Sequence, residues 1–236
     1  MLLLELHALF PTVVATDRLM LDPLVLAAQL QTLMGLRGQT ADHSAAGCAW
    51  TGDLNGVWQL HQHDDFQGLA SLVIARVWRY LEDTGFDVDQ LDLHLQRCWP
   101  VFSEWGQVVG RHHHPNAHLS AVLYLSGNGS GDEGELCLHT PQQLNELVPG
   151  LAVGHDGPIA AGHPLNQRVW TLAAEPGLLV LFPSRLEHSV TENGDEEGLR
   201  VSVSFDFALT ARAVGQPPEY LSPHPQQWYR CARPMS

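Results

Sequence analysis

Three histidines in this sequence have the spacing and neighbours that a metal site needs. His112 and His114 stand just before an apolar run, and residues i and i+2 of an extended strand face the same way, so both imidazoles can share one side. A third histidine, His188, follows a second apolar run much further along the chain. A His-x-His pair on a strand favours a bound metal; the alternative is a surface run of histidines that binds none.

An arginine in the C-terminal third has the chemistry of an anion anchor. Arg200 heads a segment of alternating small polar and apolar residues, which places Arg200, Ser202 and Ser204 on one face of a predicted strand. An arginine that projects into a barrel interior needs an anionic partner, because an unpaired buried charge is costly. A bound dicarboxylate would supply that partner through two parallel hydrogen bonds to the planar guanidinium.

The elements that position these residues are predicted to be short strands. Apolar and polar side chains alternate with a period of two, and Gly-, Asn- and Pro-rich turns separate the runs, which indicates a sandwich or a barrel. The runs cover residues 91–95, 118–125, 134–138, 177–182 and 200–207. The turn-rich stretch 140–170 has no clear period, and we expect a long insertion there that acts as a lid or substrate loop.

The N-terminal part is predicted to be helical after a short strand over residues 9–14. Asp22-Pro23 is a good N-cap and first position for a helix that ends near Gly38. A second helix is expected between a cap at Asp65 and a stop at Gly85. The apolar positions are Leu24, Ala27, Leu30, Leu33 and Met34 in the first helix, and Leu69, Leu72, Val73, Val77, Tyr80 and Leu81 in the second.

The length of 236 residues is typical of one large domain when the core is all β. We therefore predict a single domain over residues 1–236, mainly β with flanking helices, of the α+β class. Its parts are a supporting N-terminal strand and helices over 1–90, a β core over 91–212 and a tail over 213–236.

Charge and composition exclude several partners. The formal net charge of -14 would repel a phosphate backbone, so nucleic acid is not expected as a partner. No apolar run approaches the roughly 20 residues that span a bilayer, and Glu5 and His7 interrupt the apolar opening, which argues against a signal peptide. The cysteines have no CxxC spacing, so we predict reduced thiols and a cytoplasmic protein.

Taken in order, the motifs resemble the 2-oxoglutarate/Fe(II) oxygenase superfamily, and more narrowly a bacterial and phage group of such oxygenases. The motifs are His-x-His-Pro from His112, Leu-Ser-Ala-Val-Leu-Tyr-Leu over 119–125, Gly-Glu-Leu over 134–136, Pro-Gly-Leu-Leu-Val-Leu-Phe-Pro-Ser over 176–184 before His188-Ser-Val, and Arg-x-Ser-x-Ser-Phe from Arg200. The resemblance implies a jelly-roll core, or double-stranded β-helix, packed by the N-terminal helices. It also implies Fe(II), 2-oxoglutarate and O2 as cofactor and co-substrates.

The same resemblance implies a role for individual residues. His112 and His188 match the histidines that bind Fe(II). Arg200 matches the basic residue that binds the C5 carboxylate of 2-oxoglutarate, with Ser202 as a hydrogen-bonding partner. Tyr124 stands where related hydroxylases place a tyrosine that also binds this carboxylate; as an aromatic of the sandwich core it would have no such role.

The sequence departs from the superfamily at His114, where the usual set of two histidines and one carboxylate has Asp or Glu. Three interpretations are open: His114 is a third imidazole ligand, it holds a water or the substrate beside a two-histidine iron, or the carboxylate comes from elsewhere in the chain. We prefer the first, because the i and i+2 geometry puts His114 where the carboxylate normally lies.

The function predicted on this basis is hydroxylation of an amino acid, a peptide or a small metabolite, with release of succinate and CO2. Two rivals are a non-enzymatic cupin-like module that binds a metal or small ligand, and a three-histidine iron dioxygenase that does not use 2-oxoglutarate. Candidates for substrate contact are the stretch 140–170 and the loop with Trp58, His61 and His63, although exposed polar loops are often only solvated. Trp99 and Trp105 either line the pocket or pack in the core. The oligomeric state is left open.

Overall fold

The computed structural model describes residues 11–140, 163 and 167–231. Its helices are α1 (Pro23–Gly38) and α2 (Asp64–Asp83), with single 3-10 turns at Leu60–Gln62, Val88–Gln90 and Pro225–Gln227. Its strands are β1 (Ala15–Arg18), β2 (Trp50–Thr51), β3 (Leu91–Ser103), β4 (Val109–His112), β5 (Leu119–Tyr124), β6 (Glu135–His139), β7 (Val169–Ala173), β8 (Leu178–Pro183), β9 (His188–Val190) and β10 (Arg200–Ala211).

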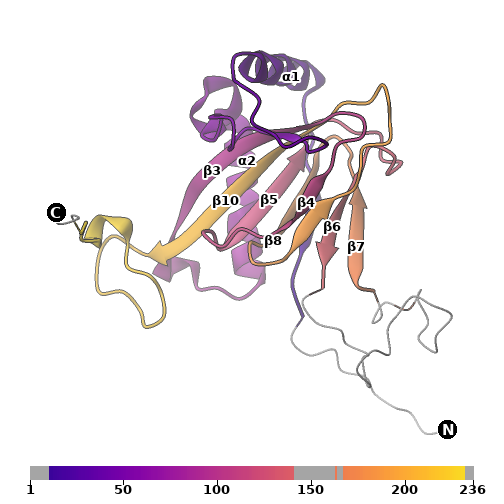
Figure 1. The fold of residues 1–236 in the computed structure, drawn as a ribbon. Helices are drawn as coiled ribbons and strands as arrows, with labels where there is room; N and C mark the ends of the chain where they lie inside the picture. The colour runs from indigo at the N-terminus through magenta and orange to yellow at the C-terminus, as the bar shows by residue number, and fades with distance from the viewer. Residues whose placement is uncertain (1–10, 141–162, 164–166, 232–236) are drawn as a thin grey trace, which may run out of the picture.

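The strands form two antiparallel sheets, and the helices lie beyond the larger one (Figure 1). The 6-stranded sheet has the order β1-β8-β5-β10-β3-β2, and the 4-stranded sheet has the order β4-β9-β6-β7. Strands close in the chain are often split between the sheets, as β4 and β5 are, which is the winding of a double-stranded β-helix. The predicted jelly-roll fold with flanking helices is confirmed.

The strand β10 lies at the centre of the large sheet and separates two environments. It pairs with β5 on one side and β3 on the other. Val203 and Phe205 are buried in the core that packs against the helices, whereas Arg200, Ser202 and Ser204 line a cavity on the opposite face. The alternation predicted for this strand is therefore confirmed.

The helix α2 covers the outer face of the large sheet with one apolar side. Val73, Val77 and Leu81 have no exposed surface and belong to the same core as Phe205. A second apolar cluster lies between the sheets, where Phe182 of β8 packs with residues of β6. The sandwich is therefore closed by apolar packing on both sides of the large sheet.

The first helix forms where the sequence predicts, but only part of its predicted apolar face is buried, because Leu33 has no exposed surface and other positions do. Asp22 caps α1, because its Oδ1 accepts hydrogen bonds from the backbone N–H of Leu24 at 2.8 Å and of Val25 at 3.2 Å. The side chains of Leu24 and Met34 were expected to be buried but are 83% and 47% exposed.

Other local predictions also need adjustment. The second helix is capped by His63 rather than Asp65, and it ends as predicted just before Gly85, whose φ is +87°. The first described strand begins at Ala15 instead of covering 9–14. The short strands β2, β7 and β9 were not predicted, and β4, the strand expected to hold both His112 and His114, ends at His112. Most of the expected insertion over 140–170 lies outside the described residues, and its end forms the beginning of β7.

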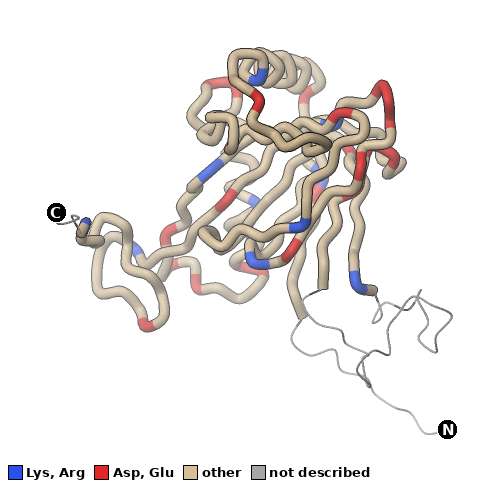
Figure 2. Tube along the Cα trace, viewed as in Figure 1, with Lys and Arg blue, Asp and Glu red and all other residues tan. Residues whose placement is uncertain are grey.

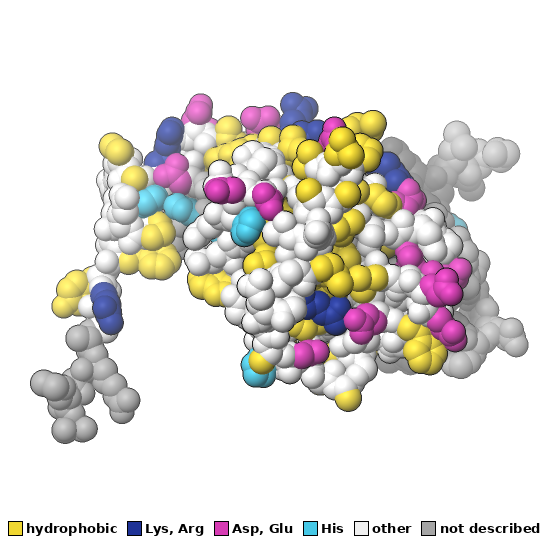
Figure 3. Space-filling view, turned by 90° about the horizontal axis from the view of Figure 1, so that it is seen from above, with side chains coloured by type: hydrophobic (Ala, Val, Ile, Leu, Met, Phe, Trp, Pro, Cys, Tyr) yellow, Lys and Arg dark blue, Asp and Glu magenta, His cyan; other side chains and the backbone are white. Residues whose placement is uncertain are grey.

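The charges are dispersed over the molecule. Figure 2 shows acidic residues on helices, loops and strand ends, with basic residues scattered among them rather than gathered in a stripe. Seen from above, hydrophobic side chains gather in the middle of the face (Figure 3). The segment after β10 folds back on β3, where the ring of His224 lies 5.1 Å from that of His94. In the part of the chain that the structure describes, no helix is both long and apolar enough to cross a membrane.

Candidate metal centre

The three histidines that the sequence singled out converge at one end of the sandwich. His112 at the end of β4 lies directly opposite His188 at the start of β9, because these residues are paired in the small sheet. His114 follows two residues after β4, and its backbone N–H donates to the carbonyl oxygen of Ser184 at 2.9 Å. One nitrogen from each ring lies within 4.8 Å of the others, which is a spacing that one metal ion can bridge.

Each of these imidazoles is held by its Nδ1 atom. Nδ1 of His112 lies 2.7 Å from the carbonyl oxygen of Gly110, and Nδ1 of His188 lies 2.8 Å from that of Leu186. Carbonyl oxygens only accept, so both Nδ1 atoms carry the proton and the Nε2 lone pairs are left for a ligand bond. Metal-binding histidines are typically oriented in this way by a hydrogen bond from the second ring nitrogen.

The third imidazole is held by a carboxylate that the sequence analysis did not select. Nδ1 of His114 lies 2.7 Å from Oδ1 of Asp206, whose side chain has no exposed surface. Asp206 also accepts from the hydroxyl of Ser120 at 2.8 Å and from Nη2 of Arg97. It stands on β10 two residues beyond Ser204, so the alternation that selected the inward face of this strand also reaches Asp206.

The electrostatics of the site favour neutral imidazoles at His112 and His188 and an ionised carboxylate at Asp206. Burial lowers the pKa of His112, and burial with the adjacent His112 lowers the pKa of His188 to about 3. Burial alone would raise the pKa of Asp206, but its interactions with His114 and the hydrogen bonds from Arg97 and Ser120 outweigh burial, and the pKa is lowered. Neutral imidazole is the form that binds a metal.

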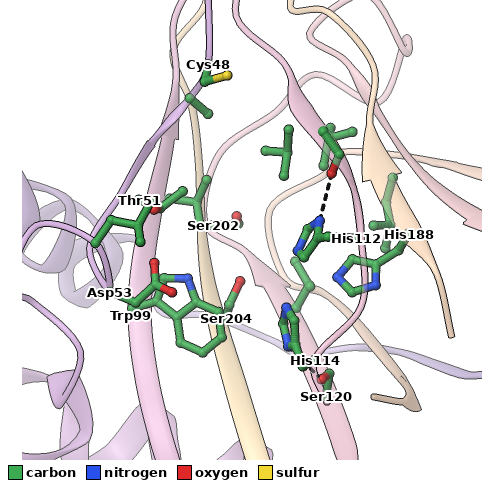
Figure 4. A pocket seen from close by; sticks show the side chains of 18 of the residues that line it. Cys48, Thr51, Asp53, Trp99, His112, His114, Ser120, His188, Ser202 and Ser204 are labelled. Atoms are coloured by element: carbon green, nitrogen blue, oxygen red, sulfur yellow. Dashed lines mark hydrogen bonds between the residues drawn. The ribbon is translucent and has the colours of Figure 1, made fainter. Parts of the chain in front are cut away.

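The histidines open into a cavity of about 510 Å³ that lies between the two sheets. Figure 4 shows Asp53, Trp99, Ser202 and Ser204 across this cavity from the three histidines. Trp99 was expected either to line the pocket or to pack in the core, and it lines the cavity. The described candidates Trp58, His61, His63 and Trp105 do not line the cavity, and Trp105 is 58% exposed.

Arg200 lies inside the same cavity and is 2% exposed. Its Nη1 donates to the backbone carbonyl oxygen of Glu133 at 2.9 Å, and no acidic side chain among the described residues forms an ion pair with it. Burial lowers the pKa of Arg200, although the guanidinium stays charged, and burial raises the pKa of the adjacent Tyr124 to about 12. The cavity therefore contains a fixed positive charge that an anion can pair with.

The turn before β6 gives Arg200 its space. Gly134 has a φ of +90°, and a Cβ atom there would stand 2.3 Å from Nη1 of Arg200. Glycine is the residue that adopts this backbone conformation without strain, and it is also the only one without a side-chain atom at this point.

Two further residues of the cavity, Arg97 and Asp53, were not predicted from the sequence. Nη1 of Arg97 lies 3.3 Å from Oδ2 of Asp53, and the Arg97 guanidinium lies 4.7 Å from the centre of the Trp99 ring. Asp53 comes from the loop after β2, and nothing local in that loop predicts that it reaches the cavity.

Comparisons with known proteins agree with the fold. The family model described as "Putative 2OG-Fe(II) oxygenase" matches residues 97–206, which contain all the motifs quoted above. No curated protein matches the sequence. The family match confirms the resemblance to the 2-oxoglutarate/Fe(II) oxygenase superfamily.

Solved structures with the same fold include enzymes of that superfamily. The α-ketoglutarate-dependent epimerase SnoN from nogalamycin biosynthesis has a TM-score of 0.59 at 17% identity, over 94% of this chain and 89% of its own. A prolyl-4-hydroxylase from Pseudomonas putida has a TM-score of 0.54 at 18% identity, over 84% and 93%. HygX from Streptomyces hygroscopicus, solved with nickel and 2-oxoglutarate, has a TM-score of 0.54 at 14% identity, over 89% and 85%.

Proposed function

We propose that this chain, whose β core resembles the 2-oxoglutarate/Fe(II) oxygenases, is itself an Fe(II)- and 2-oxoglutarate-dependent oxygenase. His112, His114 and His188 bind the metal, and Arg200 binds the far carboxylate of 2-oxoglutarate. The observation that carries the proposal is a buried arginine in the same cavity as three converging imidazoles, with no ion pair to an acidic side chain among the residues that the structure describes.

The donor set fits Fe(II). Imidazole nitrogen is a suitable ligand for this ion, and the Nδ1 hydrogen bonds of His112 and His188 leave Nε2 available on each ring. Three protein ligands leave positions open for a co-substrate and for oxygen, as a catalytic metal site requires. Bound Fe(II) would supply the oxidative chemistry, in which 2-oxoglutarate, O2 and a substrate C–H group give succinate, CO2 and a hydroxylated product.

The residues of the chain orient and shield the reacting groups. Arg200 fixes the C5 carboxylate through its planar fork and so sets which end of 2-oxoglutarate faces the histidines. We propose that Ser202 on β10 and Tyr124 on the neighbouring β5 donate hydrogen bonds to the same carboxylate, since both residues line the cavity with Arg200. The apolar wall that includes Leu136 and Phe182 excludes water from this end of the cavity.

For the substrate, we propose a small molecule or a peptide side chain that enters on the side of Asp53 and Trp99. Structural neighbours support both classes: HygX was solved with hygromycin B, and a Trichoplax adhaerens prolyl hydroxylase with a peptide fragment. Hydroxylation is the outcome we propose. A cytoplasmic location stays part of the proposal, and it is supported by the four free cysteines.

The test is an anaerobic titration of the metal-free protein with Fe(II) and then 2-oxoglutarate, following the visible metal-to-ligand charge-transfer band. We expect a band in the wild type. In Arg200→Leu we expect a normal Fe(II) content but a sharply higher 2-oxoglutarate requirement. Arg79→Leu is the control, because Arg79 is 69% exposed on α2 and pairs with Asp83. Bound iron without any band in the wild type would contradict the proposal.

One observation favours a rival function. His114 stands in place of a carboxylate, and three histidines are also the ligand set of iron dioxygenases that do not use 2-oxoglutarate. Under that rival Arg200 is unnecessary, so Arg200→Leu would keep full oxygen consumption with its substrate. A cupin-like binding module would instead bind metal with no open position and no co-substrate.

A further inference from the structure

We infer that Asp206 is the positioning carboxylate of this metal site and that it acts through His114 instead of binding the metal itself. Where the usual ligand set has a carboxylate, this site has the imidazole of His114. The carboxylate of Asp206 accepts a hydrogen bond from that imidazole on the side away from the metal site. This inference rests on the proposed role of His114 as a ligand.

The position of Asp206 is set by three strands. Asp206 on β10 is paired with Arg97 on β3 and with Ser120 on β5. Its Oδ1 accepts from Nδ1 of His114 and from the Ser120 hydroxyl, and its Oδ2 accepts from Arg97. The register of β10 against β3 shifts just after Asp206, and such bulges often aim a side chain at a site.

His114 needs this support more than the other two histidines do. Within the described residues its ring has no backbone carbonyl partner, unlike those of His112 and His188, and it lies in a loop beyond the end of β4. The hydroxyl of Ser120 lies 2.9 Å from that of Ser184, whose carbonyl oxygen accepts from the backbone N–H of His114 at 2.9 Å. The ring and backbone of His114 are therefore held by one connected network.

The chemical effect follows from the charge of Asp206. An ionised carboxylate that accepts the Nδ1 proton makes the imidazole a stronger donor at Nε2 and fixes its orientation. It also places one negative charge near a metal whose own ligands are neutral. The ion pair with Arg97 balances that charge in the buried site, where an unpaired carboxylate would be costly.

Asp53 provides a matched control, because it shares Arg97 with Asp206. Arg97 pairs with both carboxylates, so removing either one weakens its ion pairing, but of the two only Asp206 contacts His114. We would measure Co(II) affinity by competition with a chelator in Asp206→Asn and in Asp53→Asn, without 2-oxoglutarate. We expect a loss of roughly 10- to 100-fold in Asp206→Asn, the range seen when such partners are removed, and a far smaller change in Asp53→Asn.

A double-mutant cycle separates positioning from a general structural role. If Asp206 acts through His114, then Asp206→Asn has no further effect on Co(II) affinity once His114→Ala is present. The Co(II) visible spectrum should change in Asp206→Asn and stay as in wild type in Asp53→Asn. An equal loss in both backgrounds, or wild-type affinity in Asp206→Asn, overturns the inference.

Two further measurements separate a failure of the Asp206 inference from a folding defect and from a failure of the proposed function. If Asp206→Asn does not fold, the double variant Asp206→Asn/Arg97→Gln removes both charges of the ion pair and leaves no unpaired buried charge. We expect the same loss of Co(II) affinity in it. The Fe(II)–2-oxoglutarate band is recorded in parallel on the wild type. Its absence would refute the proposed function, whereas unchanged Co(II) affinity in the variants would refute only the role of Asp206.

Discussion

At the scale of residues, the proposed co-substrate site depends on one turn glycine. Gly134 holds a φ of +90° beside the Arg200 guanidinium. We expect Gly134→Ala to raise the 2-oxoglutarate concentration needed for the charge-transfer band while Fe(II) affinity stays unchanged, because a methyl group there displaces the arginine and leaves the histidines in place. The measurement is the same anaerobic titration.

Gly131→Ala is the control for that prediction. Gly131 has a similar φ of +91°, but its Cβ atom would meet only the side chain of Glu135, at 3.4 Å. Both variants should lose about 1–2 kcal/mol of stability from the left-handed backbone. Gly134→Ala should lose more, because its Cβ would also stand 2.6 Å from the backbone carbonyl oxygen of Thr191. An equal rise in the 2-oxoglutarate requirement in both would show that backbone strain, rather than the position of Arg200, is responsible.

Single-residue patterns explain which parts of the site the sequence could predict. The i and i+2 spacing of His112 and His114 and the alternation on β10 are local, and both were visible in the chain. The contact between His114 and Asp206 joins positions 92 residues apart, so it depends on how β5 and β10 pair and has no local signal. The loop residue Asp53 was missed for the same reason.

At the scale of elements, α2 should contribute stability without taking part in the site. Leu81 has no exposed surface, whereas Leu72 on the same helix is 42% exposed. We expect Leu81→Ala to lower the free energy of unfolding by about 2–5 kcal/mol, because it leaves a cavity in the core, and Leu72→Ala to change it far less. Urea denaturation gives both values.

The Co(II) affinity of folded Leu81→Ala should equal that of wild type, since α2 packs on the face of the large sheet that is turned away from the cavity. A matching loss of metal affinity would mean that the helix positions the histidines through the sheet.

The two helices also show where periodicity is informative. In α2, the apolar period selects the buried face correctly except at Leu72, which is 42% exposed. In α1, apolar residues lie on nearly all sides, and the sequence pattern cannot select which of them packs. The start of α1 was predictable because Asp22 and Pro23 act locally; its orientation depends on tertiary contacts.

At the scale of the whole molecule, the metal site joins the two sheets. His112 and His188 are paired in the small sheet, and His114 is tied to the large sheet through Asp206. The type of fold could be predicted because alternating strands leave few architectures open, but the convergence of these strands at one end could be inferred only from the resemblance to a known family.

This link predicts that metal binding stabilises the fold. A ligand that binds only the folded state at 100 times its dissociation constant adds about 2.7 kcal/mol, which for a chain of this size raises the melting temperature by roughly 5–10 °C. We expect that rise with Co(II) in a thermal melt, and its reversal by a chelator. His188→Ala removes a ligand from the small sheet and should abolish the shift. A shift of the same size in His188→Ala would place the stabilising ion elsewhere, and tight binding to the wild type without a shift would mean that the unfolded chain binds the ion equally well.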